Sequence, residues 1–466
     1  MHALVMTSGN LSEEPIETDD DLAWEHLVAA GIADALLGND RAILSRYDDS
    51  VVRTVGGVVM PVRRARGYAP RPLPLPALDA VAPCVLACGP QQKATIAFTR
   101  EDANGEAACF VSQHIGDVEN GGTFDAWNAA RTRLEDLFDL APAALACDLH
   151  PSYLSSQWAR EQARKCNLPL VEVQHHHAHI ASVMAEAIVA DQLTTDARVL
   201  GIAFDGTGAG TDGTIWGGEF LVASLGGFER AAHLRTWALP GGAASVRDAR
   251  RNAFALLTEL GLLEHPGADR LLGSLDEQTR SVTATMIERG INSPRTSSMG
   301  RLFDVAAAIL GICGQATYEG EPAIELEAAA WRALGGKTVR LDGNHAGVFT
   351  SADDSPILDP QPLIEALLNG IEAGAPADRL ALGFHIAITH ATTHIASEIC
   401  AREGLDTVAL SGGVFMNRLL LQLLTRELKS VGLTVLVPHS VPVNDGCIAY
   451  GQAAIARALL AQTASR

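Results

Sequence analysis

The sequence predicts an α/β protein, and three observations support this class. From residue 84 onward, short apolar runs of strand character alternate with longer segments of helical periodicity, which favours strands joined by crossover helices in a largely parallel sheet. Residues 198–204 are almost continuously apolar, as a strand buried on both faces of a sheet requires. Hydrophobic residues make up 47% of the chain, which is enough to build sizeable cores.

Length and charge limit the classes of function. At 466 residues the chain is long enough for about three domains. Its net charge of −20 argues against non-specific binding to nucleic acid or anionic membranes, so an anionic substrate needs helix N-termini, a metal ion or arginines. The eight cysteines form no Cys-x-x-Cys pair, no apolar run is long enough to span a bilayer, and no signal-peptide pattern opens the chain. We therefore expect a cytoplasmic protein with reduced thiols.

Residues 1–70 are predicted to form a first domain that contains a strand, a polar loop, a helix and three short strands. Strands are expected at residues 3–6, 42–44, 50–55 and 58–64, and a helix at 20–30 with Thr18 or Asp19 as its cap. Because the chain starts directly on an apolar strand, we expect this domain to be truncated.

Two features of this first domain suggest an anion site. The loop that contains Ser8 and Asn10 is rich in small polar residues and can offer backbone N–H groups to an anion, although an ordinary turn has the same composition. Arg63, Arg64 and Arg66 form a basic cluster in an acidic chain. The cluster favours a phosphate-bearing ligand, and a solvated basic face is the alternative.

A proline-rich segment separates this domain from the rest of the chain. Alternate prolines in residues 71–76 favour an extended, semi-rigid conformation, so residues 71–83 are predicted to be a linker and residues 84–466 a larger domain. A glycine turn that ends in Lys93 is expected to join the first two strands of that domain. Strands are expected at 85–88, 95–98, 107–112, 144–147 and 170–173, and helices at 124–140 and 155–165.

A histidine-rich stretch, His175-His-His-Ala-His179, is the strongest candidate site. It follows the strand at 170–173 and precedes a helical pattern at 180–189, so the histidines lie in the first turn of a helix. Side chains four residues apart share one helix face, and His175 and His179 can therefore bind one transition-metal ion, whereas His176 and His177 point elsewhere. A solvated, tag-like histidine tract is the alternative.

Asp205 ends the apolar strand at 198–204 and begins the glycine-rich turn Asp205-Gly-Thr-Gly-Ala-Gly-Thr-Asp-Gly213. The turn lacks the following helix of a dinucleotide fingerprint, and a second strand at 214–224 returns instead. Gly206 and Gly208 allow the backbone to approach a ligand closely. The turn is therefore predicted to bind phosphate and metal, with Asp205 as a third metal ligand.

Two later segments carry further candidates. Arg247 shares a predicted helix face with Arg250 or Arg251 and suggests anion handling, with a solvated face as the alternative. Carboxylates at helix starts either serve the helix dipole or hold ribose hydroxyls or an amine. The candidates of this kind are Asp304, Glu321 and Glu325.

The last predicted sites lie in the final hundred residues. A buried strand at 408–410 ends in Ser411, Gly412 and Gly413, and a helix to residue 430 follows. This arrangement would place backbone N–H groups and a helix N-terminus at one ligand, with Asn417 one turn into the helix, and a nucleotide fits it. Asp445 lies at a strand-to-helix turn, like the histidines, and is the predicted fourth metal ligand.

Together these segments resemble the Kae1-like domain of the HypF family, the carbamoyltransferases of NiFe-hydrogenase maturation. The histidine stretch, the Asp205 turn, Ser-Ser-Met-Gly-Arg-Leu-Phe-Asp304, Ser411-Gly-Gly-Val and Asn-Asp-Gly446 occur in the order of that family, and the resemblance covers nearly everything from residue 84. Residues 1–70 resemble the C-terminal half of a YrdC-like domain.

The resemblance implies an actin/Hsp70-like (ASKHA) fold for residues 84–466, with two α/β lobes and ATP between them. It implies that a carbamoyl group from carbamoyl phosphate is activated with ATP as carbamoyl-adenylate. The group then passes to the C-terminal cysteine of a HypE-like maturation partner, for synthesis of a cyanide ligand. We therefore expect neither nucleic acid nor membrane as a partner.

The resemblance also implies cofactors and roles for individual residues. A divalent metal, zinc or iron, is expected on His175, His179, Asp205 and Asp445, besides Mg²⁺ with ATP. Asp205, Arg247 and Lys93 are expected to act in the chemistry. The expected nucleotide-binding residues are Ser8, Asn10, Ser50, Arg64, Gly206, Gly208, Asp304, Glu321, Glu325, Ser411, Gly412, Gly413 and Asn417.

The sequence departs from the family in its N-terminal part. The acylphosphatase-like domain, the Cys-x-x-Cys zinc modules and the first half of the YrdC-like domain have no counterpart in it, so we expect a fragment, a misassigned start or one half of a split enzyme. The alternatives are an O-carbamoyltransferase of small-molecule biosynthesis and a non-catalytic ATP-binding scaffold. Cys313 and Cys447 lie near the motifs but are expected only to pack, because the acceptor thiol comes from the partner.

Overall fold

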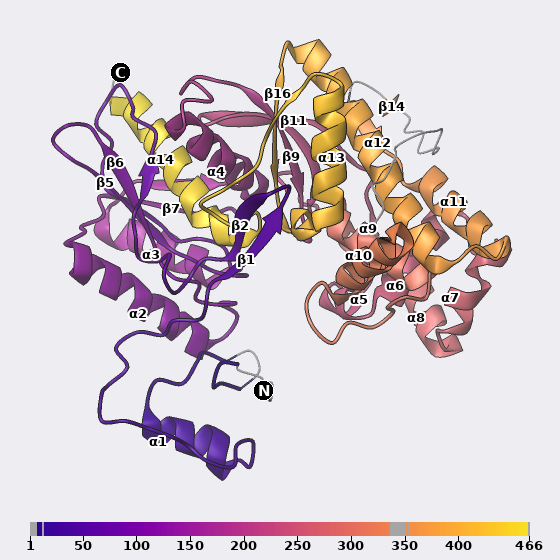
Figure 1. Ribbon diagram of the computed structural model, residues 1–466, viewed down its shortest axis with the longest axis horizontal. Helices are drawn as coiled ribbons and strands as arrows, with labels where there is room; N and C mark the ends of the chain where they lie inside the picture. Colours follow the sequence, from indigo (N-terminus) through magenta and orange to yellow (C-terminus); the bar gives the residue numbers. More distant parts are fainter. Residues whose placement is uncertain (1–6, 12–13, 336–350, 353–354, 465–466) are drawn as a thin grey trace. The chain divides into compact units, whose positions relative to one another are not determined.

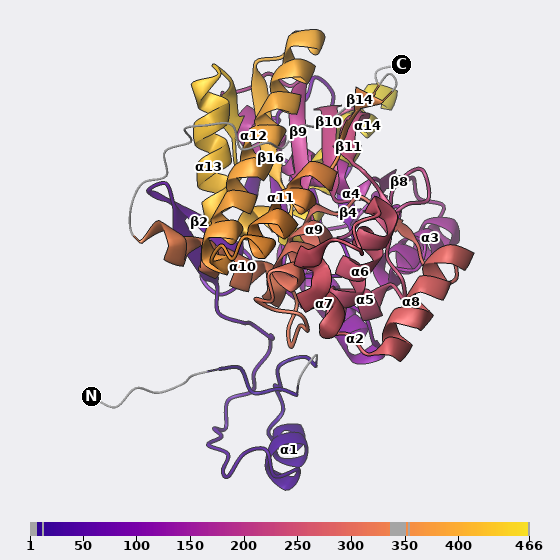
Figure 2. The same ribbon diagram turned by 90° about the vertical axis from the view of Figure 1, so that its right-hand side faces the viewer.

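The computed structural model describes residues 7–11, 14–335, 351–352 and 355–464, and it divides into two compact units (Figures 1 and 2). The first unit comprises residues 1–197 and 438–466, and the second comprises residues 198–437. The strand expected at residues 3–6 lies outside the described residues. The domain boundaries expected at residues 70 and 84 stay predictions.

A six-stranded mixed sheet forms the centre of the first unit. Its order is β3 (Leu73–Leu75), β6 (Ala107–Val111), β5 (Ala97–Glu101), β4 (Val85–Ala87), β7 (Ala144–Asp148) and β8 (Leu170–Val173). Only β4, β7 and β8 pair in parallel, and the other three strands pair antiparallel. The expectation of a largely parallel sheet is therefore wrong, because short connections such as the turn after Gly89 permit only antiparallel pairing.

Four long helices pack on this sheet and on one another. They are α2 (Gly121–Phe138), α3 (Leu154–Cys166), α4 (His175–Val189) and α14 (Ile448–Ala464). Helices α2 and α3 share a core with alternate strand residues such as Leu86 and Phe98, and Trp127 at its centre donates its indole N–H to the carbonyl of Cys88. Helix α14 contacts strands β4 to β8 and packs along α4.

The N-terminal block of the first unit contains little regular structure. Helix α1 (Asp20–Ala23) begins after the side chain of Asp19, which accepts the N–H groups of two following residues, and it continues as a π-helical turn, η1 (Trp24–Ala29). Strands β1 (Val51–Val55) and β2 (Val58–Arg63) form an antiparallel pair. The strand expected at residues 42–44 is wrong, since this short segment is mostly exposed and pairs with no strand in the described part of the chain.

The predicted linker contains an ordered strand. Residues 73–75 form β3, which pairs with β6 at the edge of the sheet. Pro74 lacks a backbone N–H, and edge positions tolerate that loss. The carbonyls of Pro74 and Pro76 accept hydrogen bonds from Tyr450 and Arg457 of α14, so this part of the linker is held by the last helix.

The second unit is built on a seven-stranded mixed sheet. Its order is β14 (Ser351–Ala352), β15 (Ser355–Leu358), β11 (Gly227–Leu234), β10 (Gly218–Ser224), β9 (Val199–Phe204), β16 (Thr407–Ser411) and β17 (Thr434–Leu436). Strand β9 is buried along its whole length, as its apolar sequence predicts, and it pairs in parallel with β16 and antiparallel with β10. A small sheet joins β12 (Trp237–Ala238) to β13 (Arg295–Thr296).

Nine α-helices are described in the second unit. They are α5 (Ala243–Arg247), α6 (Ala249–Leu260), α7 (Asp269–Gly273), α8 (Glu277–Arg289), α9 (Met299–Ile309), α10 (Glu321–Leu334), α11 (Gln361–Glu372), α12 (Ala377–Glu403) and α13 (Arg418–Ser430). One helix was expected to carry Arg247, Arg250 and Arg251, and this is wrong. The chain leaves helical geometry at Asp248, whose side chain caps α6 instead. No helix among the described residues is long and apolar enough to cross a membrane.

We predict that Gly451 is required for the close approach of α14 to α4. A Cβ at this position would lie 2.0 Å from the carbonyl oxygen of Ala178 in α4. Gly451→Ala should therefore lower the free energy of unfolding by about 1–3 kcal/mol, measured by urea unfolding. Gly383→Ala in α12 is the matched control: nothing lies within 4 Å of its Cβ, and it should stabilise the chain by up to about 1 kcal/mol. Equal stability of both variants would contradict the prediction.

Candidate metal and nucleotide sites

Helix α4 starts where the sequence predicts, with a histidine at its first position. Gln174 is the N-cap, and its side-chain oxygen accepts the N–H of His177 at 2.8 Å, which fixes the start of the helix at His175. His175 and His179 then lie on one face, and both are buried, with exposures of 1% and 0%. The alternative of a solvated histidine tract is therefore wrong.

Each of these two rings is held through its Nδ1 atom. Nδ1 of His175 lies 2.8 Å from the carboxylate of Asp148, at the carboxyl end of β7. Nδ1 of His179 lies 3.2 Å from Sγ of Cys447, in the 3-10 turn η4 (Asp445–Cys447). These contacts leave Nε2 of both rings directed toward the carboxylate of Asp445, at 3.7 and 3.6 Å.

The spacing of His175, His179 and Asp445 fits a metal ion. Distances of 3.6 and 3.7 Å exceed those of hydrogen bonds. They match the separation of about 3.4 Å between ligands of a tetrahedral ion with bonds of about 2.1 Å. One ligand atom from each of the three residues lies within 4.8 Å of the others. Two imidazoles and a carboxylate suit zinc and iron alike.

A carboxylate on α4 holds the segment that leads to Asp445. Glu186 accepts hydrogen bonds from the backbone N–H groups of residues 439, 440 and 441, at 2.7, 2.9 and 2.8 Å. Burial raises the pKa of Glu186, and these three hydrogen bonds oppose the rise. Helix α4 therefore carries two candidate ligands and also fixes the approach of the third.

In the second unit, Asp205 lies at the end of β9, where three segments meet. Its Oδ1 atom accepts the N–H groups of Gly206 at 2.7 Å and of Gly413 at 3.1 Å. Its main-chain oxygen accepts the hydroxyl of Ser298 and the N–H of Gly300, at the N-terminus of α9. One residue thus connects the turn after β9, the start of α9 and the turn after β16. Its predicted role as a metal ligand stays a prediction.

The glycines of these segments allow backbone contacts that a side chain would block. Gly412 has φ 110°, and a Cβ there would lie 2.2 Å from the carbonyl oxygen of Phe204. A Cβ at Gly300 would lie 2.9 Å from Cα of Gly206. The carbonyl of Gly208 accepts the N–H of Trp216, which closes the turn after Asp205. Ser411 is buried at the end of β16.

The N-terminus of α13 is already occupied by protein groups, and this corrects the expectation of a free helix end. Asn417 is the N-cap, after the 3-10 turn η3 (Gly413–Met416), and does not lie one turn into the helix. Its Oδ1 accepts the N–H of residue 420, and Glu327 accepts those of residues 418 and 419. The amide nitrogen of Asn417 lies 2.9 Å from Nε2 of His385. Burial lowers the pKa of His385 to about 4, so its ring is neutral and accepts this bond.

The predicted acidic residues of the second unit have different surroundings. Asp304 is buried in α9 and pairs with Arg301 at 3.0 Å; burial raises its pKa to about 6. The carboxylate of Glu321 accepts hydrogen bonds from the backbone N–H and the hydroxyl of Thr317, which lower the pKa of Glu321. Glu321 therefore stabilises the loop that precedes α10. Glu325 lies one turn later in α10 and is half-buried.

The predicted cationic residues have different surroundings. Arg247 is exposed at the end of α5, and Arg250 forms a bidentate pair with Asp248. Lys93 is half-buried with φ 45°, and its backbone N–H donates to the carboxylate of Asp117. Arg64 is buried, and its guanidinium donates to the carbonyls of residues 68, 71 and 111. Arg64 is therefore not part of a solvated basic face, whereas Arg66 of the same cluster is exposed.

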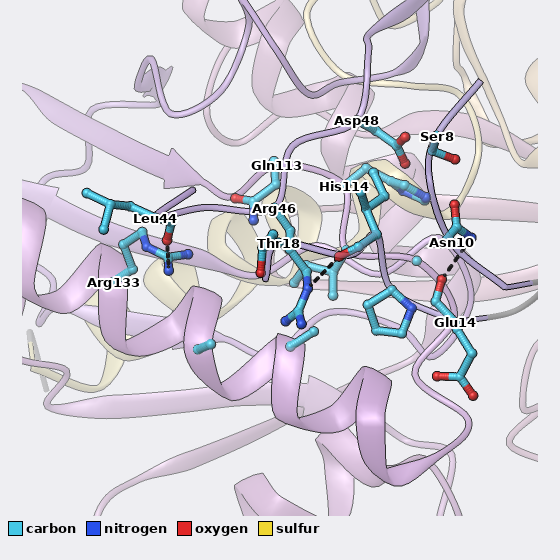
Figure 3. A pocket seen from close by; sticks show the side chains of 16 residues that line it. Ser8, Asn10, Glu14, Thr18, Leu44, Arg46, Asp48, Gln113, His114 and Arg133 are labelled. Atoms are coloured by element: carbon cyan, nitrogen blue, oxygen red, sulfur yellow. Dashed lines mark hydrogen bonds between the residues drawn. The ribbon is translucent and has the colours of Figure 1, made fainter. Parts of the chain in front are cut away.

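A cavity of about 150 Å³ lies in the first unit between the N-terminal block and the loop of residues 113–116 (Figure 3). Ser8 and Asn10 line it beside His114, and Arg133 reaches from α2 to the carbonyl of Leu44. The predicted role of Ser8 and Asn10 in nucleotide binding stays a prediction. The other charged residues that line the cavity are Glu14, Arg46 and Asp48. Ser50 lies elsewhere: its hydroxyl donates to the carbonyl of Arg66 and accepts the N–H of Ala65.

Four residues around these sites were not recognised from the sequence. They are Asp148, Glu186, Glu327 and Cys447, of which only the cysteine was considered, as a packing residue. Asp148 ends an apolar strand, and that position was the available signal for it. The other three act on partners more than ninety residues away, and spacing along the chain cannot reveal such contacts.

Comparisons with known proteins agree with this architecture. Residues 80–186 match the family model described as the HypF Kae1-like domain, and residues 201–452 match that of the carbamoyltransferase Kae1-like domain, second subdomain. Carbamoyltransferase HypF2 of Cupriavidus necator is 38% identical over 97% of this chain and 56% of its own length. A HypF homolog of the same organism is 38% identical over 82% of this chain and 93% of its own length.

A solved structure gives the same result. The crystal structure of full-length HypF in the phosphate- and nucleotide-bound form superposes with a TM-score of 0.86 at 37% identity, covering 97% of this chain and 67% of that one. The matches confirm the predicted Kae1-like fold. The chain spans 56% of the length of several of the curated relatives that it matches.

We predict that Asp304 makes stability depend on pH. The folded state raises its pKa from 3.8 to about 6, so it holds the proton more tightly than the unfolded chain does. That stabilisation is lost as the pH rises through this window. The free energy of unfolding of the wild type minus that of Asp304→Asn should fall by at most about 3 kcal/mol between about pH 4 and pH 7, measured by urea unfolding.

Asp276→Asn is the control for this measurement. Hydrogen bonds from Thr279 lower the pKa of Asp276, so the corresponding difference should rise with pH. A difference for Asp304→Asn that does not change with pH would contradict the role given to burial.

Proposed function

Because this chain belongs to the HypF carbamoyltransferase family, we propose that it transfers a carbamoyl group in the maturation of NiFe-hydrogenases. The observation that carries the proposal is the relationship over 97% of the chain, together with two buried histidines that direct Nε2 to one carboxylate. Carbamoyl phosphate is the proposed donor, and the carbamoyl group is activated with ATP as carbamoyl-adenylate. The acceptor is the C-terminal cysteine of a HypE-like partner.

In the proposed site, a divalent metal binds to His175, His179 and Asp445, with Asp205 as the fourth ligand. Zinc and iron both fit this set of donors. The metal would supply positive charge at the phosphates of the nucleotide. The residues of the chain would hold the ligand atoms in place: Asp148 orients His175, and Glu186 fixes the segment that carries Asp445.

The nucleotide is proposed to bind, with Mg²⁺, at the turns that Asp205 connects. Gly206, Gly208, Gly412 and Gly413 would allow its phosphates to approach the backbone. We propose that Asp205, Arg247 and Lys93 act in the chemistry. The further proposed contacts are Ser8, Asn10, Ser50, Arg64, Asp304, Glu321, Glu325, Ser411 and Asn417.

Four cysteines of this chain are poor candidates for the thiol that accepts the carbamoyl group. Burial raises the pKa of Cys84 and Cys400 to about 11, and that of Cys109 and Cys147 to about 12. The thiolate is the reactive form of cysteine, so these groups are poor nucleophiles at neutral pH. In the proposed transfer, the partner's thiolate attacks the carbamoyl carbon, a carbon–sulfur bond forms, and AMP leaves.

We predict that the purified chain releases pyrophosphate from ATP only when carbamoyl phosphate is present. Asp205→Asn should reduce that release by about 100-fold or more, because it removes a charge from the proposed site. Asp196→Asn, an exposed substitution, should leave it unchanged. Pyrophosphate is measured by a coupled assay, and ATP binding by calorimetry. Binding of ATP without release of pyrophosphate would favour a nucleotide-binding scaffold. Transfer to a small-molecule hydroxyl would favour an O-carbamoyltransferase.

We predict that His175→Ala combined with His179→Ala abolishes stoichiometric metal binding. The double variant loses two of the proposed ligands, whereas His394→Ala removes an exposed histidine of α12 that pairs with Glu398. Metal content of the purified proteins is measured by mass spectrometry. Wild-type metal content in the double variant would overturn the metal site.

A further inference from the structure

A thiol from the last turn before α14 lies behind one of the two candidate ligand histidines. Cys447 is fully buried, and its Sγ lies 3.2 Å from Nδ1 of His179. We infer that Cys447 is a positioning residue, which accepts a hydrogen bond from Nδ1–H of His179 and thereby holds Nε2 toward Asp445. The inference rests on the proposed metal site and deepens it, because it assigns the orientation of one ligand to a residue that is not a ligand.

The chemistry of imidazole requires such a partner. Only a ring nitrogen without a proton can bind a metal, so the proton of the neutral ring must sit on the other nitrogen. That N–H needs an acceptor when it is buried. For His175 the acceptor is the carboxylate of Asp148, at 2.8 Å. Sγ of Cys447 occupies the equivalent place behind His179.

The position of Cys447 excludes a role as a ligand beside Asp445. Its sulfur contacts Nδ1 of His179, whereas the carboxylate of Asp445 faces Nε2, across the ring. Both residues belong to the 3-10 turn η4, which Asn444 closes by accepting the N–H of Gly446 on its side chain and that of Cys447 on its carbonyl, both at 3.0 Å. One short turn therefore supplies a carboxylate to one edge of the ring and an acceptor to the other.

The two histidines are held with unequal strength. A carboxylate is a strong acceptor, and sulfur is a weak one. In Cys447→Ala the buried Nδ1–H loses its acceptor, and the ring can carry its proton on Nε2 or turn. Zn²⁺ affinity should fall by about 10-fold, the lower end of the range for such a loss. In Asp148→Ala it should fall by about 100-fold. Cys447→Ser should recover part of the loss, since a hydroxyl also accepts from Nδ1–H.

The first measurement is Zn²⁺ affinity by competition with a chromophoric chelator, on the full chain. Cys400→Ala is the matched control, because it removes a buried thiol from α12 in the second unit and should leave the affinity unchanged. Thermal unfolding of the metal-free variants shows whether each is folded. Wild-type affinity in Cys447→Ala would overturn the inference.

The second measurement does not depend on metal. Ring-nitrogen NMR of the ¹⁵N-histidine-labelled, metal-free chain reports which nitrogen of His179 carries the proton, with His179→Ala for assignment. We expect the Nδ1–H form in the wild type and a shift to Nε2–H in Cys447→Ala. An unchanged proton position overturns the inference, even where affinity falls. If the proton shifts in Cys447→Ala although the wild-type chain binds no Zn²⁺, the positioning role is supported and the metal site alone is overturned.

Discussion

The first unit depends on the cost of burying polar groups on α4. A histidine or a carboxylate removed from water destabilises the fold unless it finds hydrogen-bond partners. Helix α4 buries the rings of His175 and His179 and most of Glu186, and their partners come from the end of β7, the turn after Asn444 and the backbone of residues 439–441. The hydrogen bonds to the buried polar groups of α4 therefore fix three other parts of the unit. These are the parts that surround the candidate metal site.

The second unit uses a single carboxylate in a comparable way. Asp205 accepts N–H groups from two turns, and its carbonyl accepts donors from the start of α9. Because each of these segments follows a strand or precedes a helix, the rigid elements of the sheet set their positions. The side chains of Glu327 and Asn417 accept the free N–H groups in the first turn of α13. Anion binding in this unit would therefore depend on turns rich in glycine more than on a helix end.

Local sequence patterns predicted most of the elements and the positions of the candidate ligands within them, because both follow from spacing. His175 and His179 lie on one helix face, β9 is fully buried, and Asp445 opens a turn before the last helix, as expected. Strand direction could not be read from periodicity, so the mixed sheets were missed. The break at Asp248 and the capping of α13 by Glu327 depend on tertiary hydrogen bonds. Such partners are fixed by the fold, and apolar periodicity carries no signal for them.

The discontinuity of the first unit has a consequence for the order in which the protein is made. His175 is separated from Asp445 by the whole of the second unit, and α14 is the last helix of the described chain. During translation, the histidines leave the ribosome long before the turn that orients one of them. Loop closure between such distant segments must wait until residues 438–466 are made. The geometry of the candidate metal site is thus a late product of folding, because a nascent chain holds His179 before the turn that orients it.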